Sequence, residues 1–256
     1  MAKRYVAEHR GKLFNLLWPL TRYLITNLSV AVAFVLFFLF NRTTVLRRRN
    51  VPRRRNTLLL SNHQSMIDSF LVGMCAYYPW SWLKPSLIPW NPAAQENFYG
   101  QPLLAWFSDQ WKCIPVREGR RDLRALYRMM TALRGGTMTL FPEGTRSRDG
   151  SVGPGRPGAG LLVLGNHPTV IPVAIDGMGD LLPVGSRWPR LGKRVYVYFG
   201  RPFDTSEFLT RPRSKETAQE LVDRVLVTIR RQQRAVRRLR RFRARYGRAA
   251  STPRRS

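Results

Sequence analysis

A run of nineteen residues without a formal charge, YLITNLSVAVAFVLFFLFN from Tyr23 to Asn41, lies near the start of this 256-residue chain. As a helix, such a run is about as long as the hydrocarbon layer of a bilayer is thick. It is too apolar for one core helix of a soluble domain, and it lacks the small-residue cleavage pattern of a secretory signal. We therefore expect the first part of the chain to lie in a membrane.

Basic residues flank this run on both sides, which disfavours a single crossing because Lys and Arg prefer the cytoplasmic side. A second apolar piece, Leu13 to Thr21, precedes the run and contains Pro19 as a natural bend. We expect residues 1–46 to form a membrane-embedded helical hairpin with both ends on the cytoplasmic side, at the inner (plasma) membrane. One full span is the alternative. The flanking basic residues are Lys3, Arg4, Arg10, Lys12, Arg42, Arg47, Arg48, Arg49, Arg53, Arg54 and Arg55.

The chain is strongly basic, with 44 Lys and Arg against 15 Asp and Glu and a formal charge of +29. Such a field attracts polyanions, so nucleic acid and an anionic membrane surface are both candidates. The apolar run favours the membrane, and we expect no nucleic-acid partner. Cys75 and Cys113 lack C-x-x-C spacing and are expected to be buried thiols, so they support neither a zinc site nor a disulfide framework.

Strands alternate with helices between residues 47 and 210. Expected strands cover residues 57–60, 112–116, 137–141, 170–175 and 194–199, and expected helices cover 64–78, 122–134 and 161–165. This alternation predicts an α/β domain, with a layered, mixed sheet and flanking helices.

The last part of the chain, residues 211–256, predicts a helix and an arginine-rich tail. Thr217 and Glu220 have the spacing of a capping box at the start of that helix. The stretch from Arg230 to Arg248, both included, contains ten arginines. They predict a basic helix at anionic lipid headgroups, with a solvated, partly disordered tail as the alternative. An apolar stripe that can dock on the domain consists of Leu221, Val225 and Ile229.

The stretch SNHQSMIDSF, Ser61 to Phe70, follows an apolar strand and holds one of three histidines. On one regular helix, His63 and Asp68 would point about 140° apart and could not meet. If His63 lies in the loop and Asp68 in the first turn of the helix, the carboxylate can fix the imidazole tautomer and leave the other nitrogen free as a base. Spacing alone leaves open a simpler reading, in which His63 only caps the helix.

A second polar turn, FPEGTRSRDG, follows the strand that ends at Phe141. Gly144 permits close backbone approach, Thr145 offers a hydroxyl, and Arg146 presents a fork that matches phosphate oxygens. The turn lacks the pattern of a nucleotide P-loop, so ATP hydrolysis is not indicated. An ordinary glycine turn held by an Arg–Glu pair is the alternative.

Together these stretches resemble the glycerolipid acyltransferases typified by 1-acyl-sn-glycerol-3-phosphate acyltransferase. NHQSMID (Asn62 to Asp68) is similar to the family's H-x-x-x-x-D motif and FPEGTRS (Phe141 to Ser147) to its F-P-E-G-T-R-S motif. VIPVAIDG (Val170 to Gly177) resembles its last block. The similarity covers about residues 56 to 203, and the first two motifs in this order and separation are specific.

The resemblance implies that His63 is the general base and Asp68 its orienting partner. It also implies acyl transfer from acyl-CoA or acyl carrier protein to a lysophospholipid, without a metal or other cofactor. The residues that it places at the phosphate region of the acceptor are Glu143, Gly144, Thr145 and Arg146.

One block departs from the family pattern, because Val116 is followed by Arg117 and Glu118 where an Asp-Arg or Arg-Arg pair is common. We expect Arg117 to make a second phosphate contact, with Arg120 or Arg121 as substitutes. The acceptor headgroup therefore stays open. Lysophosphatidate is the first candidate, and another lysolipid, a glycolipid or an amino-acid lipid is the alternative.

Direct transfer in a ternary complex is the expected mechanism. Ser61 and Ser65 flank the base, so an acyl-serine intermediate is the rival chemistry. The rival of another class is a non-enzymatic, basic protein that binds membranes or nucleic acid.

Overall fold

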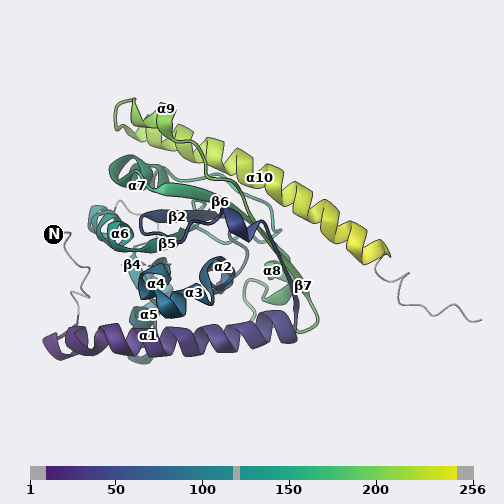
Figure 1. Cartoon of the computed structure of the whole chain (residues 1–256), viewed down its shortest axis with the longest axis horizontal. Helices are drawn as coiled ribbons and strands as arrows, with labels where there is room; N and C mark the ends of the chain where they lie inside the picture. Colours follow the sequence, from purple (N-terminus) through teal and green to yellow (C-terminus); the bar gives the residue numbers. More distant parts are fainter. Residues whose placement is uncertain (1–9, 118–121, 247–256) are drawn as a thin grey trace, which may run out of the picture.

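The computed structural model describes residues 10–117 and 122–246 (Figure 1). A five-stranded sheet lies at the centre, with the strand order β1-β7-β6-β2-β5 and helices on both faces. The expected α/β class with a mixed sheet is thus confirmed. The strands are β1 (Arg42–Leu46), β2 (Thr57–Ser61), β5 (Thr137–Leu140), β6 (Thr169–Asp176) and β7 (Arg194–Phe199).

The central strand β2 runs parallel to both β5 and β6, whereas β7 runs antiparallel to β6 and parallel to β1. A second, parallel pair consists of β3 (Asn91–Ala94) and β4 (Cys113–Val116). A parallel bridge between Trp90 and Met138 joins this pair to β5. The carboxyl ends of β2 to β6 therefore meet along one edge, which we call the carboxyl edge.

The sequence pattern predicted five of these strands and missed two. Residues 42–46, expected in the N-terminal hairpin, form β1 and pair with β7. Two threonines and a valine favour a strand there, although the neighbouring apolar run obscured the signal. β3 contains Pro92, which disfavoured a strand prediction.

Each of the three helices expected within the domain is present with shifted ends, whereas five other helices in the described residues, one of them in the Trp-rich stretch 80–90, were not predicted. The expected helix 64–78 begins only at Asp68, because residues 62–67 form a turn. The helices that build the domain are α2 (Asp68–Tyr77), α3 (Trp80–Leu83), α4 (Gln95–Phe98), α5 (Pro102–Gln110), α6 (Leu123–Gly135), α7 (Gly158–Asn166), α8 (Met178–Leu181), α9 (Ser206–Leu209) and α10 (Lys215–Tyr246). Short 3₁₀ turns are η2 (Arg48–Asn50) and η3 (Pro85–Leu87).

The predicted capping box of the last helix is wrong. α10 begins at Lys215, and the Ser214 hydroxyl accepts the Thr217 N–H at 3.1 Å. Glu220 instead forms ion pairs with Arg211 and Arg224, each at 2.8 Å. The helix continues to Tyr246, so this part of the basic segment is helical.

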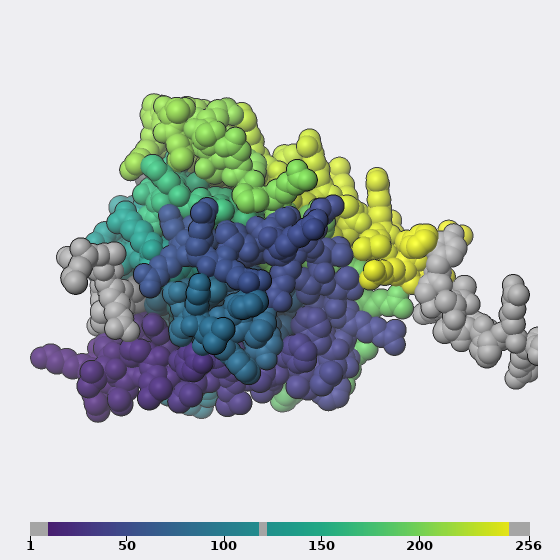
Figure 2. All heavy atoms as spheres, viewed as in Figure 1, coloured from purple at the N-terminus to yellow at the C-terminus, as the bar shows by residue number. Residues whose placement is uncertain are grey.

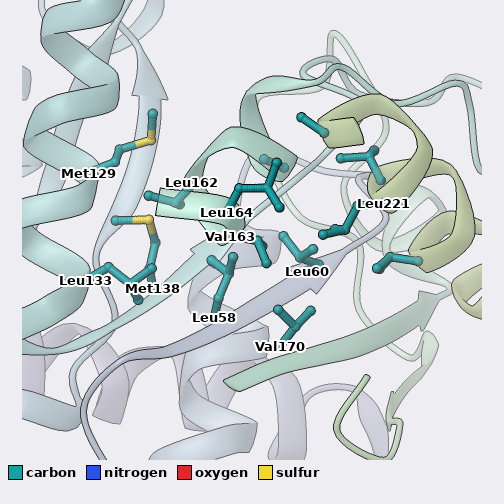
Figure 3. Packing of buried hydrophobic residues seen from close by; sticks show 14 of the residues in the cluster. Leu58, Leu60, Met129, Leu133, Met138, Leu162, Val163, Leu164, Val170 and Leu221 are labelled. Atoms are coloured by element: carbon teal, nitrogen blue, oxygen red, sulfur yellow. The ribbon is translucent and has the colours of Figure 1, made fainter. Parts of the chain in front are cut away.

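Side chains of β2 fill the core on both faces of the sheet, and every residue of this strand is buried. Because successive side chains alternate, Leu58 and Leu60 face α6, α7 and α10, whereas Leu59 faces α2. Figure 3 shows Leu58, Leu60 and Val170 beside Leu162 to Leu164 of α7 and Leu221 of α10. The strand that leads to His63 is therefore held from both sides.

The expected N-terminal hairpin is wrong, because the apolar segment forms one continuous helix. α1 (Lys12–Phe34) runs straight into a π-helical segment, η1 (Val35–Leu39). Together they make 28 residues, the one helix in the described part of the chain that is long and apolar enough to cross a membrane. α1 lies along the domain on the side of the sheet opposite α10 (Figure 1).

Pro19 lies inside this helix, and contacts with α5 on either side of it keep the chain helical. Proline removes one backbone hydrogen bond and favours a bend. On either side, the Trp18 indole donates to the Asp109 carbonyl at 3.0 Å and the Thr26 hydroxyl donates to the Gln110 carbonyl at 2.9 Å. The helix is thereby fixed along the domain, and the proline is accommodated.

The outward face of α1 is apolar and exposed. Its leucines recur every three or four residues, and Leu16 and Leu28 are 75% and 67% exposed. A soluble surface rarely keeps so large a contiguous apolar patch in water. This face also includes Leu13, Leu17, Leu20, Leu24 and Val32.

Gly160 offers a test of the packing between α7 and α10. A methyl group added there would come within 2.1 Å of the Ala218 carbonyl oxygen, whereas nothing lies within 4 Å at Gly158 of the same helix. We expect Gly160→Ala to destabilise the fold by about 1–3 kcal/mol or more through overpacking. Gly158→Ala should stay within about 1 kcal/mol of wild type. Urea unfolding in detergent measures both, and equal midpoints would contradict this packing.

Candidate active site

His63 and Asp68 meet in the turn between β2 and α2. The Nδ1 atom of His63 lies 2.9 Å from Oδ2 of Asp68. The same oxygen accepts the backbone N–H groups of Gln64 at 2.6 Å and Ser65 at 2.8 Å. The chain can bring the two residues together because the helix starts only at Asp68, as the spacing argument required.

The pair has the arrangement that general-base chemistry needs. Asp68 is fully buried, whereas the His63 side chain is 17% exposed and stacks on Phe141 with ring centroids 3.9 Å apart. A carboxylate at Nδ1 favours the tautomer with its proton on that atom. Nε2 has no protein partner among the described residues and is left as the basic nitrogen.

The FPEGTRS turn lies next to this pair, at the end of the neighbouring strand. Gly144 closes it with an N–H bond of 3.1 Å to the Phe141 carbonyl and has a φ of 71°, a backbone conformation that favours glycine. The Ser147 N–H donates to the His63 carbonyl at 2.8 Å. The two predicted motifs therefore form one site at the carboxyl edge.

Glu143 connects three loops through its buried carboxylate. One oxygen accepts the His63 N–H at 3.0 Å and the other accepts the Gly153 N–H at 2.7 Å. This glutamate therefore holds the backbone of the candidate base, a contact that sequence reasoning did not predict. Its expected part in acceptor binding stays a prediction.

Thr145 and Arg146 line a cavity of about 380 Å³ beside Glu143. Arg148 and Arg156 line it too, so three guanidinium groups surround this space. The Arg156 N–H donates to the Pro142 carbonyl at 2.8 Å. Glu143 and Asp149 line the cavity as well, so its arginines outnumber its carboxylates by one, and the arginines supply donors that match phosphate oxygens. Apart from its place in a Gly- and Pro-rich loop, Arg156 has no sequence signal that marks it as a site residue.

Arg117 lies at the carboxyl edge, just beyond β4, and its side chain is exposed. β4 lies three strand spacings from β2, a distance of about 14 Å across the strands. No contact joins Arg117 to the His63–Asp68 pair; its own N–H lies 3.4 Å from an Asp122 oxygen. Arg120 and Arg121 lie outside the described residues.

Two polar side chains at the end of β2, Asn62 and Gln64, were not predicted as site residues. Asn62 bridges to β6: its amide donates to the Ile175 carbonyl at 3.0 Å and accepts the Ile175 N–H at 2.8 Å. Gln64 donates to the Gly150 carbonyl at 3.2 Å and accepts the Met178 N–H at 3.1 Å. Both hold the His63 turn against its neighbours.

The acyltransferase family model matches residues 42–176, which include all the candidate site residues and more than half of the chain. The chain belongs to this family.

Curated relatives are acyltransferases of plants. A chloroplastic 1-acyl-sn-glycerol-3-phosphate acyltransferase of Brassica napus is 26% identical over 152 residues, which are 57% of this chain and 41% of the relative. A chloroplastic counterpart from Arabidopsis thaliana is also 26% identical, over 58% of this chain and 39% of its own length. The chain thus spans about two fifths of the length of these relatives.

A solved structure has the same fold. The 1-acyl-sn-glycerophosphate acyltransferase of Thermotoga maritima aligns with 88% of this chain and 97% of its own length, with a TM-score of 0.60 and 24% sequence identity.

The pH dependence of stability tests the burial of Glu143. Burial raises the pKa of its carboxyl above the ordinary 4.5, against the opposing effects of the Gly153 and His63 N–H donors. The folded state therefore binds this proton more tightly than the unfolded state. The stability that this bound proton contributes is fully present below the pKa of the unfolded state. It is lost as pH rises through the pKa of the folded state.

We therefore expect the free energy of unfolding of wild type to fall relative to that of Glu143→Gln as pH rises from about 4 toward neutrality. The glutamine also leaves one N–H without an oxygen acceptor, a cost that does not depend on pH. Urea midpoints of both proteins across this range give the difference. A constant difference, or one that shifts in favour of wild type, would show that the carboxyl is not held this way.

Proposed function

We propose that this chain transfers a fatty acyl group from a thioester of coenzyme A or acyl carrier protein to the free hydroxyl of a lysophospholipid. Lysophosphatidate, which would give phosphatidate, is the acceptor of choice. The observation that carries the proposal is the 2.9 Å contact of His63 with buried Asp68 beside the arginine-lined turn. Membership of the acyltransferase family and the similarity to plant 1-acyl-sn-glycerol-3-phosphate acyltransferases support it.

In the proposed reaction, Nε2 of His63 takes the proton of the acceptor hydroxyl while its oxygen attacks the thioester carbonyl carbon. Asp68 stabilises the imidazolium that forms. The tetrahedral intermediate then breaks its carbon–sulfur bond, and the thiolate leaves with the proton that the imidazolium returns. The products are the ester and the free thiol, and the transfer needs no metal or other cofactor.

The acceptor phosphate is proposed to bind in the cavity of Thr145, Arg146 and Arg156. Arginine forks match phosphate oxygens, and Gly144 leaves the backbone open beside them. Arg117, farther along the same edge, suits a more distant part of the headgroup.

Direct transfer is proposed rather than an acyl-serine intermediate. Ser61 and Ser65 are both fully buried. The Ser61 hydroxyl donates to the Asn62 carbonyl at 3.0 Å, and the Ser65 hydroxyl has no partner within the described chain. Neither is presented to a donor, and a thioester is activated enough to react without a covalent relay.

The outward face of α1 is proposed to rest in the bilayer, with the domain on the cytoplasmic side of the inner (plasma) membrane. Its leucines would be buried among acyl chains. An anionic membrane surface suits the basic chain, and no nucleic-acid partner is proposed. A lysolipid would then reach the carboxyl edge from the membrane while the donor arrives from water.

His63→Ala should lower acyl transfer from palmitoyl-CoA to lysophosphatidate by about 10²–10⁴-fold. Asp68→Asn should lower kcat by a similar factor with KM nearly unchanged, because an amide oxygen can still accept the two backbone N–H groups while the charge is lost. A radiometric assay with lysophosphatidate and other lysolipids in parallel measures both effects and ranks the acceptors. Full activity of either variant would refute the proposed base.

The membrane role of α1 is tested by Leu16→Ser, Leu20→Ser and Leu24→Ser combined. These side chains are exposed, so the fold should survive while affinity for vesicles falls by at least about tenfold. A control away from α1 is Leu123→Ser, at an exposed leucine of α6, which packs on α7. Vesicle flotation measures binding, and unchanged flotation of the triple variant would remove α1 from the proposed interface.

A further inference from the structure

The loop between α8 and β7, residues 182–193, exposes apolar side chains to water. Trp188 is 81% exposed and Leu191 is 58% exposed. The loop reads LPVGSRWPRLGK, with three cations and no carboxylate. Single exposed apolar residues are common on soluble proteins and carry no argument alone. The surroundings of this loop therefore decide what its exposed tryptophan does.

Hydrogen bonds fix the α8–β7 loop to the end of the apolar helix. The Gly192 N–H donates to the Phe40 carbonyl at 2.9 Å, and the Lys193 N–H donates to the side-chain oxygen of Asn41 at 2.8 Å. Asn41 is buried, and its amide also donates to the Leu36 carbonyl at 2.8 Å. The loop and the last turn of η1 therefore form one unit of the surface.

The exposed apolar face of α1 continues into this unit. It passes along Val32, Val35 and Leu39, whose spacings of three and four residues keep them on one side of the helix. Figure 1 shows the loop after α8 beside the end of this helix. In Figure 2, green atoms reach the same lower edge of the molecule as the purple helix. Loop and helix thus expose apolar side chains on one side of the protein.

A cavity lined by cations lies directly beside these apolar side chains. Arg42, Lys193 and Arg194 line this space of about 430 Å³ together with Arg240 and Ala244 of α10. No carboxylate of the described residues lines it. Arg240 is engaged by two aspartates of the domain, whereas the other three cations form no ion pair within the described residues. The cavity therefore offers uncompensated positive charge to an anion.

Further cations surround the cavity. Arg187 and Arg190 lie on either side of Trp188 in the sequence and are exposed. At the end of α10, the Arg243 side chain donates to the Thr44 hydroxyl at 3.4 Å, so the basic helix also ends beside β1. We call these cations the basic rim, which consists of Arg42, Arg187, Arg190, Lys193, Arg194 and Arg243.

The combination of apolar side chains and basic rim favours an anionic bilayer as the partner. Tryptophan prefers the boundary between water and lipid, and neighbouring basic residues bind anionic headgroups. Nucleic acid would engage the cations but would leave Leu191 and the end of α1 in water. A soluble protein would have to occupy the level at which α1 is proposed to meet lipid.

We propose that the α8–β7 loop is a second membrane contact, in which Trp188 and Leu191 enter the bilayer interface while the basic rim holds anionic lipid headgroups. The inference extends the membrane role proposed for α1 and rests on it. α1 supplies apolar contact along its length, and the rim makes binding depend on negatively charged lipid. The cavity of Arg42 and Lys193 suits the phosphate of one headgroup.

A fluorophore at position 188 tests the contact directly. Cys75 and Cys113 are buried, so Trp188→Cys supplies one exposed thiol for an environment-sensitive label. On vesicles of phosphatidylcholine and phosphatidylglycerol, we expect its emission to shift to the blue and to be quenched by lipid with a doxyl group near the headgroup. Leu123→Cys, at an exposed position of α6, is the control and should report water. Emission unchanged from water at position 188 of vesicle-bound protein would overturn the proposal.

Two double variants separate the apolar and the charged parts of the contact. Trp188→Ser with Leu191→Ser should weaken binding to these vesicles by about tenfold. Arg190→Gln with Lys193→Gln should weaken it by a similar factor and leave binding to pure phosphatidylcholine nearly unchanged. Vesicle flotation measures both, and the effect of the charge variant should shrink as salt increases.

The matched controls are Leu123→Ser with Tyr127→Ser on α6, and Arg55→Gln with Arg134→Gln at the opposite edge of the sheet, where β2 and β5 begin. Equal losses in loop and control variants would overturn the proposal. So would a loss of duplex-DNA binding in the charge variant without any loss of vesicle binding.

Activity in detergent micelles keeps this inference separate from the proposed function. With lysophosphatidate and palmitoyl-CoA, the loop variants should retain the kcat of wild type, because the loop contributes no residue to the candidate active site. If the labelled loop enters vesicles but wild type transfers no acyl group, the proposed function fails and the second contact stands. If active wild type binds no vesicles, the second contact and the membrane role of α1 both fail.

Discussion

One oxygen atom, Oδ2 of Asp68, organises the site. It accepts bonds from the His63 ring and from the N–H groups of Gln64 and Ser65. The two backbone bonds stop the chain from becoming helical before Asp68, and that delay places the ring against the carboxylate. Local backbone conformation and the electrostatics of the imidazole thus depend on the same atom, which is fully buried and shielded from water.

The parallel strands supply the second constraint. Because β2 and β5 run in the same direction, the loops that follow them must leave from the same edge, and Glu143 then joins them by accepting the His63 N–H. The Asn62 amide performs a similar task toward β6. The backbone of His63 and its neighbour Asn62 is therefore held from both adjoining strands, and little freedom remains to this loop.

Motifs with local logic were predictable from the sequence. His63, Asp68 and the FPEGTRS turn follow apolar strands at recognisable spacings. They meet because those strands, β2 and β5, are parallel neighbours in the sheet. Contacts between residues far apart in the chain were not predictable. Arg156 and Gln64 act through partners that no local pattern identifies, and β1 was hidden beside a far stronger apolar signal.

The prediction of an N-terminal hairpin failed for a related reason. Pro19 ordinarily marks a bend, and contacts with a helix more than 80 residues away, among them those of Trp18 and Thr26, outweigh this preference. The capping box predicted at Thr217 is absent because the helix begins at Lys215, and the hydroxyl of Ser214 just before it accepts the Thr217 N–H.

The attachment of α1 at both of its ends has a mechanical consequence. Trp18 ties one end to α5, and β1, which follows almost at once, ties the other to the sheet. The helix therefore cannot move independently of the domain. The fold thus fixes the distance between His63 and any surface that α1 contacts. Under the proposed function, the fold would therefore set how far a lipid acceptor has to leave the bilayer to reach His63.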